Sequence, residues 1–536
     1  MKYSRAALGM LNAQYKSVLK KCILLNLGMC ALALPALANG YDLKDGDKVI
    51  LTANTSIVND VPTESSGRKT AILAAGDTSI STGDYTLTVT ADQASARNYI
   101  FNTVTAGTDF KFTGNLDATD IGTGSSDNRG IRTNAKATLL FDGSVKVGVF
   151  SDTNNAIAVD IWGGSEVTFK GKLTDLKTEK SSGYYSYGVQ IYEDAGAVAN
   201  FEAEQTNISV KGGNFANAVF VNGGSVNIKG DANLSAQNTT GRARVIALES
   251  NPSPVHDSYV SLSGNNIALT SSTVGNWDAW GIYASGFTCT VDINSQNLTI
   301  DVSSERIAHG LTSQFSGTVH LYSGTVTTIN ATSEDGSAIG IEASWWDGSA
   351  GKIISEGELN VTAQATTAIA VGSSNTGSFT ANKINAKALG ENAKAVDVSN
   401  GATLTIKQLN AKAQGTTWAT ALNINDADSV VVGTDDTNTV LSSTAEYGAE
   451  GVWLSGGEAE LKGNVSVSAE AEDFAWGVSL SEGTLTTDDL TVSASGDYAN
   501  ALYLSDESTL NLNGKMLHRQ PEIVRDTGQI LIPTVF

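Results

Sequence analysis

Cysteine and proline are both scarce in this chain. Its 536 residues include three cysteines and six prolines, and only 17% of the residues are charged. Two of the cysteines, Cys22 and Cys30, fall in the N-terminal segment, so Cys289 is the one cysteine in the rest of the chain. A single cysteine excludes an internal disulfide, and stability must come from packing and backbone pairing. The abundant Thr, Ser, Gly, Ala, Asn and Val favour short strands joined by turns over helices.

Basic residues are fewer than acidic residues, and the familiar catalytic motifs are absent. The chain has 34 basic and 56 acidic residues, a net charge of −22, and an acidic surface repels phosphate backbones, so we expect no nucleic-acid partner. No histidine lies in an H-E-x-x-H motif, and the sequence contains no Gly-x-Ser-x-Gly elbow, P-loop, dinucleotide fingerprint or EF-hand. The sequence therefore predicts a protein that is not an enzyme, with no catalytic residues, no cofactor and no bound metal.

The chain has one long apolar run, and it lies near the N-terminus. Lys16, Lys20 and Lys21 precede the stretch CILLNLGMCALALPALA, which ends at Ala38. Basic residues followed by a short apolar run and a small-x-small site are typical of a secretory signal peptide. The sequence predicts a signal peptide over residues 1–38, cleavage between Ala38 and Asn39, and export.

A short pattern recurs along the remainder of the chain. It reads ANAVFVNGGSVNIKG from Ala216 and ANALYLSDESTLNLNG from Ala499: a small residue, an alternating apolar pair, a turn and a second alternating stretch. Alternation with period two indicates strands. Most copies begin roughly 24 to 32 residues after the previous one, a spacing typical of solenoids. Three short strands and three corners per copy would make one rung of a helix of parallel strands.

The sequence therefore predicts an all-β fold: a single-stranded, right-handed parallel β-helix of the pectin-lyase-like kind with about 15 rungs. Residues 39–70 are expected to form an N-terminal cap or first rung, and residues 71–514 the β-helix. Residues 515–536 contain two of the six prolines and no repeat, so we expect a non-repeat tail.

The basic-then-apolar signal, the rungs rich in Gly, Thr, Ser and Asn, the lack of a disulfide and the acidic balance resemble the passenger region of Gram-negative autotransporters. The similarity is to pertactin-like adhesins and covers roughly residues 10–514. It implies adhesion at the cell surface or outer membrane, with outer-membrane export machinery as a partner. Family members end in a translocator barrel. This sequence has 22 residues after the last rung. We therefore expect a truncated product that stays in the periplasm or outside the cell.

Aromatic residues suggest where a ligand would bind. Tyr187, Trp280 and Trp476 each precede the small residue of a rung, and Trp345 and Trp346 lie in a lengthened loop. We expect this column to lie at an exposed corner, where the rings could stack on host or bacterial surface glycans or contact proteins. Two alternatives stay open: a secreted polysaccharide-active β-helix enzyme (lyase or hydrolase), and a structural envelope protein that self-associates.

Overall fold

The computed structural model describes most of the chain from Ala38 onward. The predicted signal segment 1–37, Trp345 and Trp346 lie outside the described residues. The described ranges are 38–58, 61–63, 68–92, 98–103, 105–122, 127–134, 136–152, 154–181, 185–192, 196–250, 257–344, 350–505, 507–519, 523–525 and 529–531.

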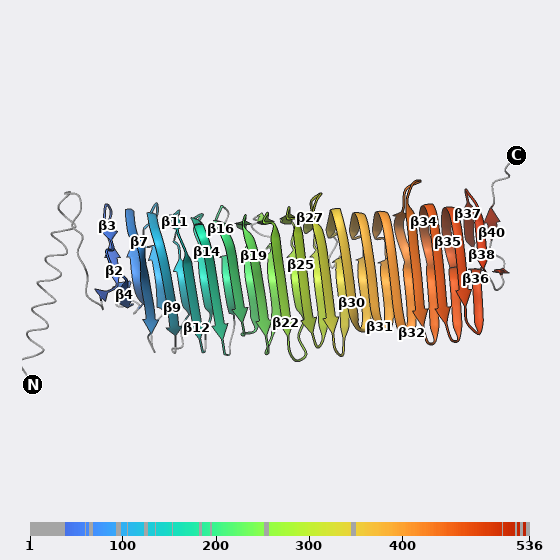
Figure 1. The fold of residues 1–536 in the computed structure, drawn as a ribbon, viewed down its shortest axis with the longest axis horizontal. Helices are drawn as coiled ribbons and strands as arrows, with labels where there is room; N and C mark the ends of the chain where they lie inside the picture. Colours follow the sequence, from blue (N-terminus) through green and yellow to red (C-terminus); the bar gives the residue numbers. More distant parts are fainter. Residues whose placement is uncertain are drawn as a thin grey trace, which may run out of the picture.

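The described residues form one all-β solenoid of about 15 turns, which confirms the predicted fold. The strands lie side by side along a single axis, from the N-terminal end to the C-terminal end (Figure 1). Each rung pairs in parallel with the next through three faces, which we call A, B and C. Among these residues there is no helix, and none therefore offers a helical membrane span.

Face A carries the small residue of each rung. Its separate strands are β2 (Tyr41–Leu43), β6 (Arg68–Ala74), β8 (Asn98–Thr103), β10 (Asn128–Arg132), β13 (Ala156–Ile161), β15 (Tyr185–Tyr192), β17 (Phe215–Asn222), β20 (Arg242–Glu249), β23 (Ala279–Ser285), β26 (Ile307–Gln314), β29 (Ser337–Ala343), β36 (Tyr498–Leu504) and β39 (Ile523–Arg525).

Faces B and C complete each rung. The strands of face B are β3 (Lys48–Ile50), β11 (Thr138–Asp142), β18 (Gly224–Ile228), β21 (Ser258–Leu262), β24 (Cys289–Ile293), β27 (Thr318–Leu321), β37 (Ser508–Leu512) and β40 (Gln529–Leu531). Those of face C are β1 (Ala38–Asn39), β4 (Thr55–Val58), β12 (Val145–Ser151), β19 (Asp231–Asn238), β22 (Asn266–Thr273), β25 (Asn297–Ser304), β28 (Val326–Ser333), β33 (Asn438–Ala445) and β38 (Met516–Arg519).

Several strands continue through a corner from one face to the next. They are β7 (Asp77–Asp92), β9 (Asp109–Gly122), β14 (Glu166–Lys180), β16 (Val198–Lys211), β30 (Lys352–Ser374), β31 (Ser378–Ser399), β32 (Thr403–Val432), β34 (Gly448–Ala471) and β35 (Phe474–Ser495). Beyond Gly514 the sequence loses its repeat, yet β38, β39 and β40 pair in parallel with the preceding rung and extend the three faces.

The interior is filled by columns of apolar side chains, as the alternation predicts. Each predicted inward pair is fully buried, and the pairs are Val219/Val221, Val396/Val398, Val478/Leu480 and Leu502/Leu504. Aromatic rings also stack from rung to rung, with centroids 5.2 Å apart for Phe141 and Phe169 and 5.0 Å apart for Phe169 and Phe201. Burial of these columns is the main stabilising contribution of the fold.

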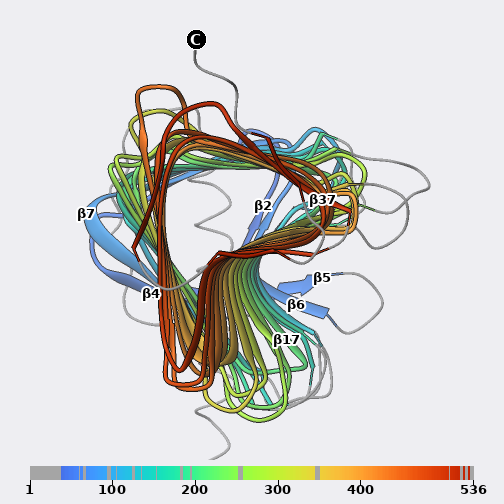
Figure 2. The ribbon, with the colours of Figure 1, turned by 90° about the vertical axis from the view of Figure 1, so that its right-hand side faces the viewer.

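Face A is bent inward at the small residue of each rung, so its outer surface is concave (Figure 2). A β-carbon built on Gly188 would lie 2.2 Å from Cγ2 of Ile208 on face C and 2.5 Å from the carbonyl oxygen of Ala218 in the next rung. Such distances leave no room for a side chain. Gly188 and Val189 therefore both face the interior, and the inside-outside alternation breaks at the bend.

The size of the residue at the bend is complementary to the face C residue that approaches it. Between Gly130 and Gly477, glycine stands opposite a β-branched residue, in the pairs Gly130–Val147, Gly188–Ile208, Gly281–Ile300, Gly310–Ile329, Gly340–Val361, Gly451–Val467 and Gly477–Val492. Where the same face C column holds leucine or alanine, the bend residue has a side chain, in the pairs Ala158–Leu176, Ala218–Leu234, Val245–Leu269, Ala370–Ala386, Ala395–Ala411 and Ala421–Leu441.

At the N-terminal end, a short antiparallel pair lies on the concave side. Strand β5 (Val61–Thr63) pairs with Arg68–Thr70 of β6, in the one antiparallel pairing among the described strands. Figure 2 shows β5 and β6 at the mouth of the concave surface.

Candidate functional site

Two columns of outward-facing side chains line the concave surface of face A, one on each side of the bend; we call this surface the groove. The first column is the residue before the bend, and it comprises Arg129, Ile157, Tyr187, Asn217, Arg244, Trp280 and His309. The second lies two residues after the bend, and it comprises Arg132, Asp160, Gln190, Phe220, Ala247, Tyr283 and Thr312.

The larger cavity in the groove, of 410 Å³, is lined by six aromatic residues, seven polar or charged residues and Ile157. Tyr187 stacks on Phe220 with centroids 5.2 Å apart and planes 6° apart, and each is 6% exposed, so the two rings form the floor. Tyr185, at 36% exposed, stacks beside Tyr187 and Phe215 at 5.4 and 5.7 Å and forms a wall. This cluster is separate from the interior core. Apolar walls with a few polar groups are typical of small-ligand sites.

A smaller cavity of 290 Å³ lies next along the groove. Trp280 stacks on His309 with centroids 5.1 Å apart and planes 3° apart. The Arg244 guanidinium lies 4.4 Å from the Tyr283 ring centroid and 5.1 Å from that of Trp280, within cation–π range. His309 Nδ1 is 3.4 Å from a carboxylate oxygen of Glu342. Although burial acts to raise it, the pKa of Glu342 is lowered by the hydrogen bond and charge of His309.

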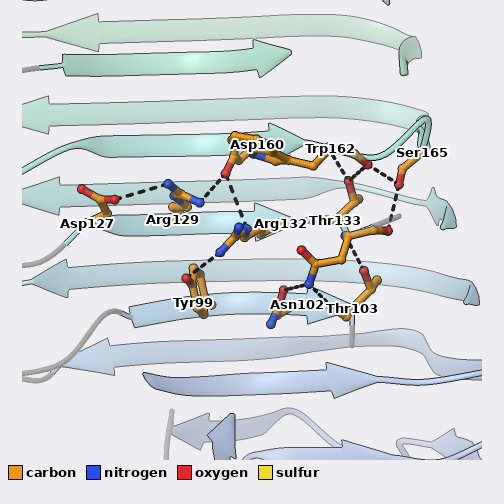
Figure 3. A network of polar contacts seen from close by, with 11 residues as sticks. Tyr99, Asn102, Thr103, Asp127, Arg129, Arg132, Thr133, Asp160, Trp162 and Ser165 are labelled. Atoms are coloured by element: carbon orange, nitrogen blue, oxygen red, sulfur yellow. Dashed lines mark hydrogen bonds and ion pairs between the residues drawn. The ribbon is translucent and has the colours of Figure 1, made fainter. Parts of the chain in front are cut away.

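A buried ion-pair network closes the N-terminal side of the larger cavity (Figure 3). Arg129 Nη1 lies 2.8 Å from Asp160 Oδ2, and Trp162 Nε1 donates to Asp160 Oδ1 at 2.7 Å. Arg132 Nη1 donates to the Tyr99 hydroxyl at 2.8 Å. Burial raises the pKa of Asp160, and the two guanidiniums and the indole N–H oppose that rise. The network orients Arg129 and Trp162, both of which line the cavity.

Three buried polar atoms at the larger cavity have no hydrogen-bond partner among the residues that the structure describes. They are Oδ1 of Asn217, a residue that is 1% exposed, Nε of Arg244, which is 6% exposed, and Nε of Arg129. All three residues line the cavity. A buried polar atom without a partner destabilises by about 1–3 kcal/mol, so a polar ligand or water in the cavity would stabilise this site.

The structure places the sequence-predicted contact residues in different surroundings. Tyr187 and Trp280 line the two cavities, but they are 6% and 7% exposed, so the expectation that these rings are exposed at a corner is wrong. They are covered because the bend is concave and neighbouring rungs stack on them. Trp476 is half-buried and packs 5.8 Å from Trp418 near the C-terminal end, away from both cavities. The role of Trp345 and Trp346 stays a prediction.

Sequence reasoning missed most of the polar groups of the groove. Arg129 and Arg244 precede the bend residues Gly130 and Val245. The position that identified Tyr187 and Trp280, directly before the bend residue, could therefore have identified both arginines. Phe220 belongs to the second column, and strict alternation does not distinguish the residues of this column from other outward-facing residues. No group of histidine, cysteine and acidic side chains within the described part of the chain could hold a metal ion.

Comparison of the chain with protein-family models, with curated proteins and with solved structures finds no match.

Proposed function

We propose that this chain is an exported, non-enzymatic β-solenoid that mediates cell-surface interaction by binding saccharide chains along its groove. The observation that carries the proposal is the pair of neighbouring cavities lined by stacked aromatic rings and buried polar side chains. Sugar rings combine an apolar face with a rim of hydroxyls, and such a surface matches both. The sequence pattern of a signal peptide and the resemblance to adhesin passengers support export and a surface role.

The carboxylates of the groove support binding rather than hydrolysis. Glycoside hydrolysis ordinarily uses two carboxyl groups on either side of the scissile bond. Among the described lining residues, the larger cavity has one carboxylate, Glu249, and the smaller cavity has one, Asp278. Each is paired with an arginine: Glu249 with Arg244 at 2.6 Å and Asp278 with Arg306 at 3.2 Å.

A glycan array followed by calorimetry on the full chain tests the proposal. Binding to at least one saccharide is expected, and Tyr185→Ala should weaken it about tenfold, because a well-packed interface ring contributes on the order of 1.4 kcal/mol or more. The matched control is Tyr85→Ala, which removes a similarly exposed tyrosine from the part of β7 between its face B and face C pairings, outside face A. Failure to bind any glycan, or equal losses in the two variants, would contradict the proposal.

A further inference from the structure

Arginine is concentrated in the groove, although the chain as a whole is strongly acidic. Seven of its ten arginines lie along face A and its edge, while the net charge is −22: Arg68 and Arg525 lie in the end strands β6 and β39, and the other five are at positions 129, 132, 242, 244 and 306. The guanidinium is the cation best suited to bind carboxylate and sulfate groups, because its donors match two acceptor oxygens at once. The arginines are therefore placed where they would select an anionic ligand.

Arg242 and Arg244 form the centre of this arrangement. They alternate along β20, and both guanidiniums lie over the same two rings, at 5.9 and 5.7 Å from Phe215 and at 5.9 and 5.1 Å from Trp280. Two like charges so close to shared rings repel each other. Glu249 offsets the charge of Arg244, whereas Arg242 makes no ion pair with any residue that the structure describes.

Around the smaller cavity the cations exceed the anions. Four basic side chains face three carboxylates: Arg244 pairs with Glu249, Arg306 with Asp278 and His309 with Glu342, whereas Arg242 has no carboxylate partner among the described residues. One positive charge is thus left over at a half-buried position, since Arg242 is partly buried. A half-buried charge is stabilised by an anion that replaces lost water.

The unpartnered polar atoms agree with a ligand that both accepts and donates. Among the residues that the structure describes, Arg244 Nε is a donor with no acceptor, and Asn217 Oδ1 is an acceptor with no donor. A carboxylate or sulfate oxygen would satisfy the first, and a sugar hydroxyl would satisfy the second. Asn217 and Arg244 are adjacent in register on β17 and β20, so one bound saccharide residue can reach both.

We propose that the groove selects an acidic saccharide, whose carboxylate or sulfate group binds between Arg242 and Arg244 while its sugar rings pack against Tyr185 and Trp280. This inference rests on the proposed saccharide-binding function and adds the charge of the ligand to it. Tyr187 and Trp280 are three rungs apart, about 14 Å at the usual strand spacing, so the site holds a short oligosaccharide.

Calorimetry on the full chain with three matched tetrasaccharides tests the inference. The probes are a galacturonate tetramer, a sulfated galactose tetramer and a neutral galactose tetramer of the same linkage. At least one acidic probe should bind tenfold or more tightly than the neutral one. Tighter binding of the galacturonate tetramer than of the sulfated tetramer identifies a carboxylate ligand, and tighter binding of the sulfated tetramer identifies a sulfate ligand. Equal binding of all three would overturn the inference and leave the proposed function standing. Binding of none would count against both.

Charge-removing variants then locate the anion. Arg242→Gln should weaken binding of the acidic probe about tenfold and leave the neutral probe within twofold, as expected for loss of a charge-assisted contact. The matched control is Lys407→Gln, which removes an exposed cation from β32 outside the groove. This change should leave the affinity for both the acidic and the neutral probe unaltered. Arg244→Gln is a second test, and its melting curve shows whether loss of the Glu249 ion pair disturbs folding. Equal weakening of acidic and neutral probes by Arg242→Gln would contradict the anion site.

Discussion

Replacement of Gly477 by alanine tests whether the bend of face A depends on close approach across the interior. The new β-carbon would lie 2.2 Å from Cγ1 of Val492 and 2.5 Å from the carbonyl oxygen of Ala501. Valine has little χ1 freedom in a strand, and the carbonyl belongs to a paired rung, so neither group can move easily. We expect Gly477→Ala to lower the free energy of unfolding by about 1–3 kcal/mol, the usual range for an overpacked core.

A second substitution in the same rung should relieve the clash. The double variant Gly477→Ala/Val492→Ala reproduces the Ala370–Ala386 pair found elsewhere in the solenoid. We expect the two changes to couple favourably by about 0.5–3 kcal/mol, so that the double variant is more stable than the sum of the single effects predicts. The matched control is Gly372→Ala on the same face, where a β-carbon would meet nothing closer than 3.6 Å.

Urea unfolding of five proteins, with hydrogen exchange over the affected rung, measures these effects: the parent chain, Gly477→Ala, Val492→Ala, the double variant and Gly372→Ala. Hydrogen exchange is needed because a long solenoid can open rung by rung. Gly372→Ala should leave the free energy of unfolding unchanged or raise it by up to about 1 kcal/mol, because alanine restricts the unfolded chain more than glycine does. If Gly477→Ala is tolerated as well as Gly372→Ala, or if Val492→Ala gives no relief, the steric account of the bend is wrong.

Two further predictions concern Lys180 and the N-terminus. Burial lowers the pKa of Lys180 to about 8 from 10.5, so the unfolded state binds more protons in that interval, and the free energy of unfolding should rise with pH relative to Lys180→Met. Urea midpoints between pH 8 and 10 measure this difference, and parallel curves for the two proteins would refute it. N-terminal sequencing of exported protein should begin at Asn39, and a mature form that keeps Lys20 and Lys21 would contradict cleavage after Ala38.

The sequence predicted the solenoid and its interior columns, because period-two alternation and a regular rung length both depend on local chain geometry. It did not predict the groove. Ser479 alternates with Val478 and Leu480 and should therefore be exposed, but it is only 6% exposed, in register with Trp453 and Tyr503 beside the bend. Alternation tells which side chains point outward, but it does not give the curvature of the face from which they point.

The groove residues were hidden for the same reason. The column before the bend was visible from the sequence, since every member except Arg244 precedes a glycine or an alanine. Whether that column meets the second one depends on the angle between the two arms of face A, which is set by contacts such as Gly188 with Ile208 across the interior. The stacking of Tyr187 on Phe220 is therefore a consequence of tertiary packing that no local pattern contains.

The size match at the bend has a consequence for how such a chain can change its length. Both members of each matched pair belong to the same rung: Gly477 and Val492 are 15 residues apart, and Gly188 and Ile208 are 20 apart. A duplication or deletion that spans one whole rung carries both members together, so the interior of the altered solenoid still fits. A recombination point between the two members separates them and leaves either a clash or a void. Rungs are therefore the natural units of exchange, with boundaries at the corners outside each matched pair.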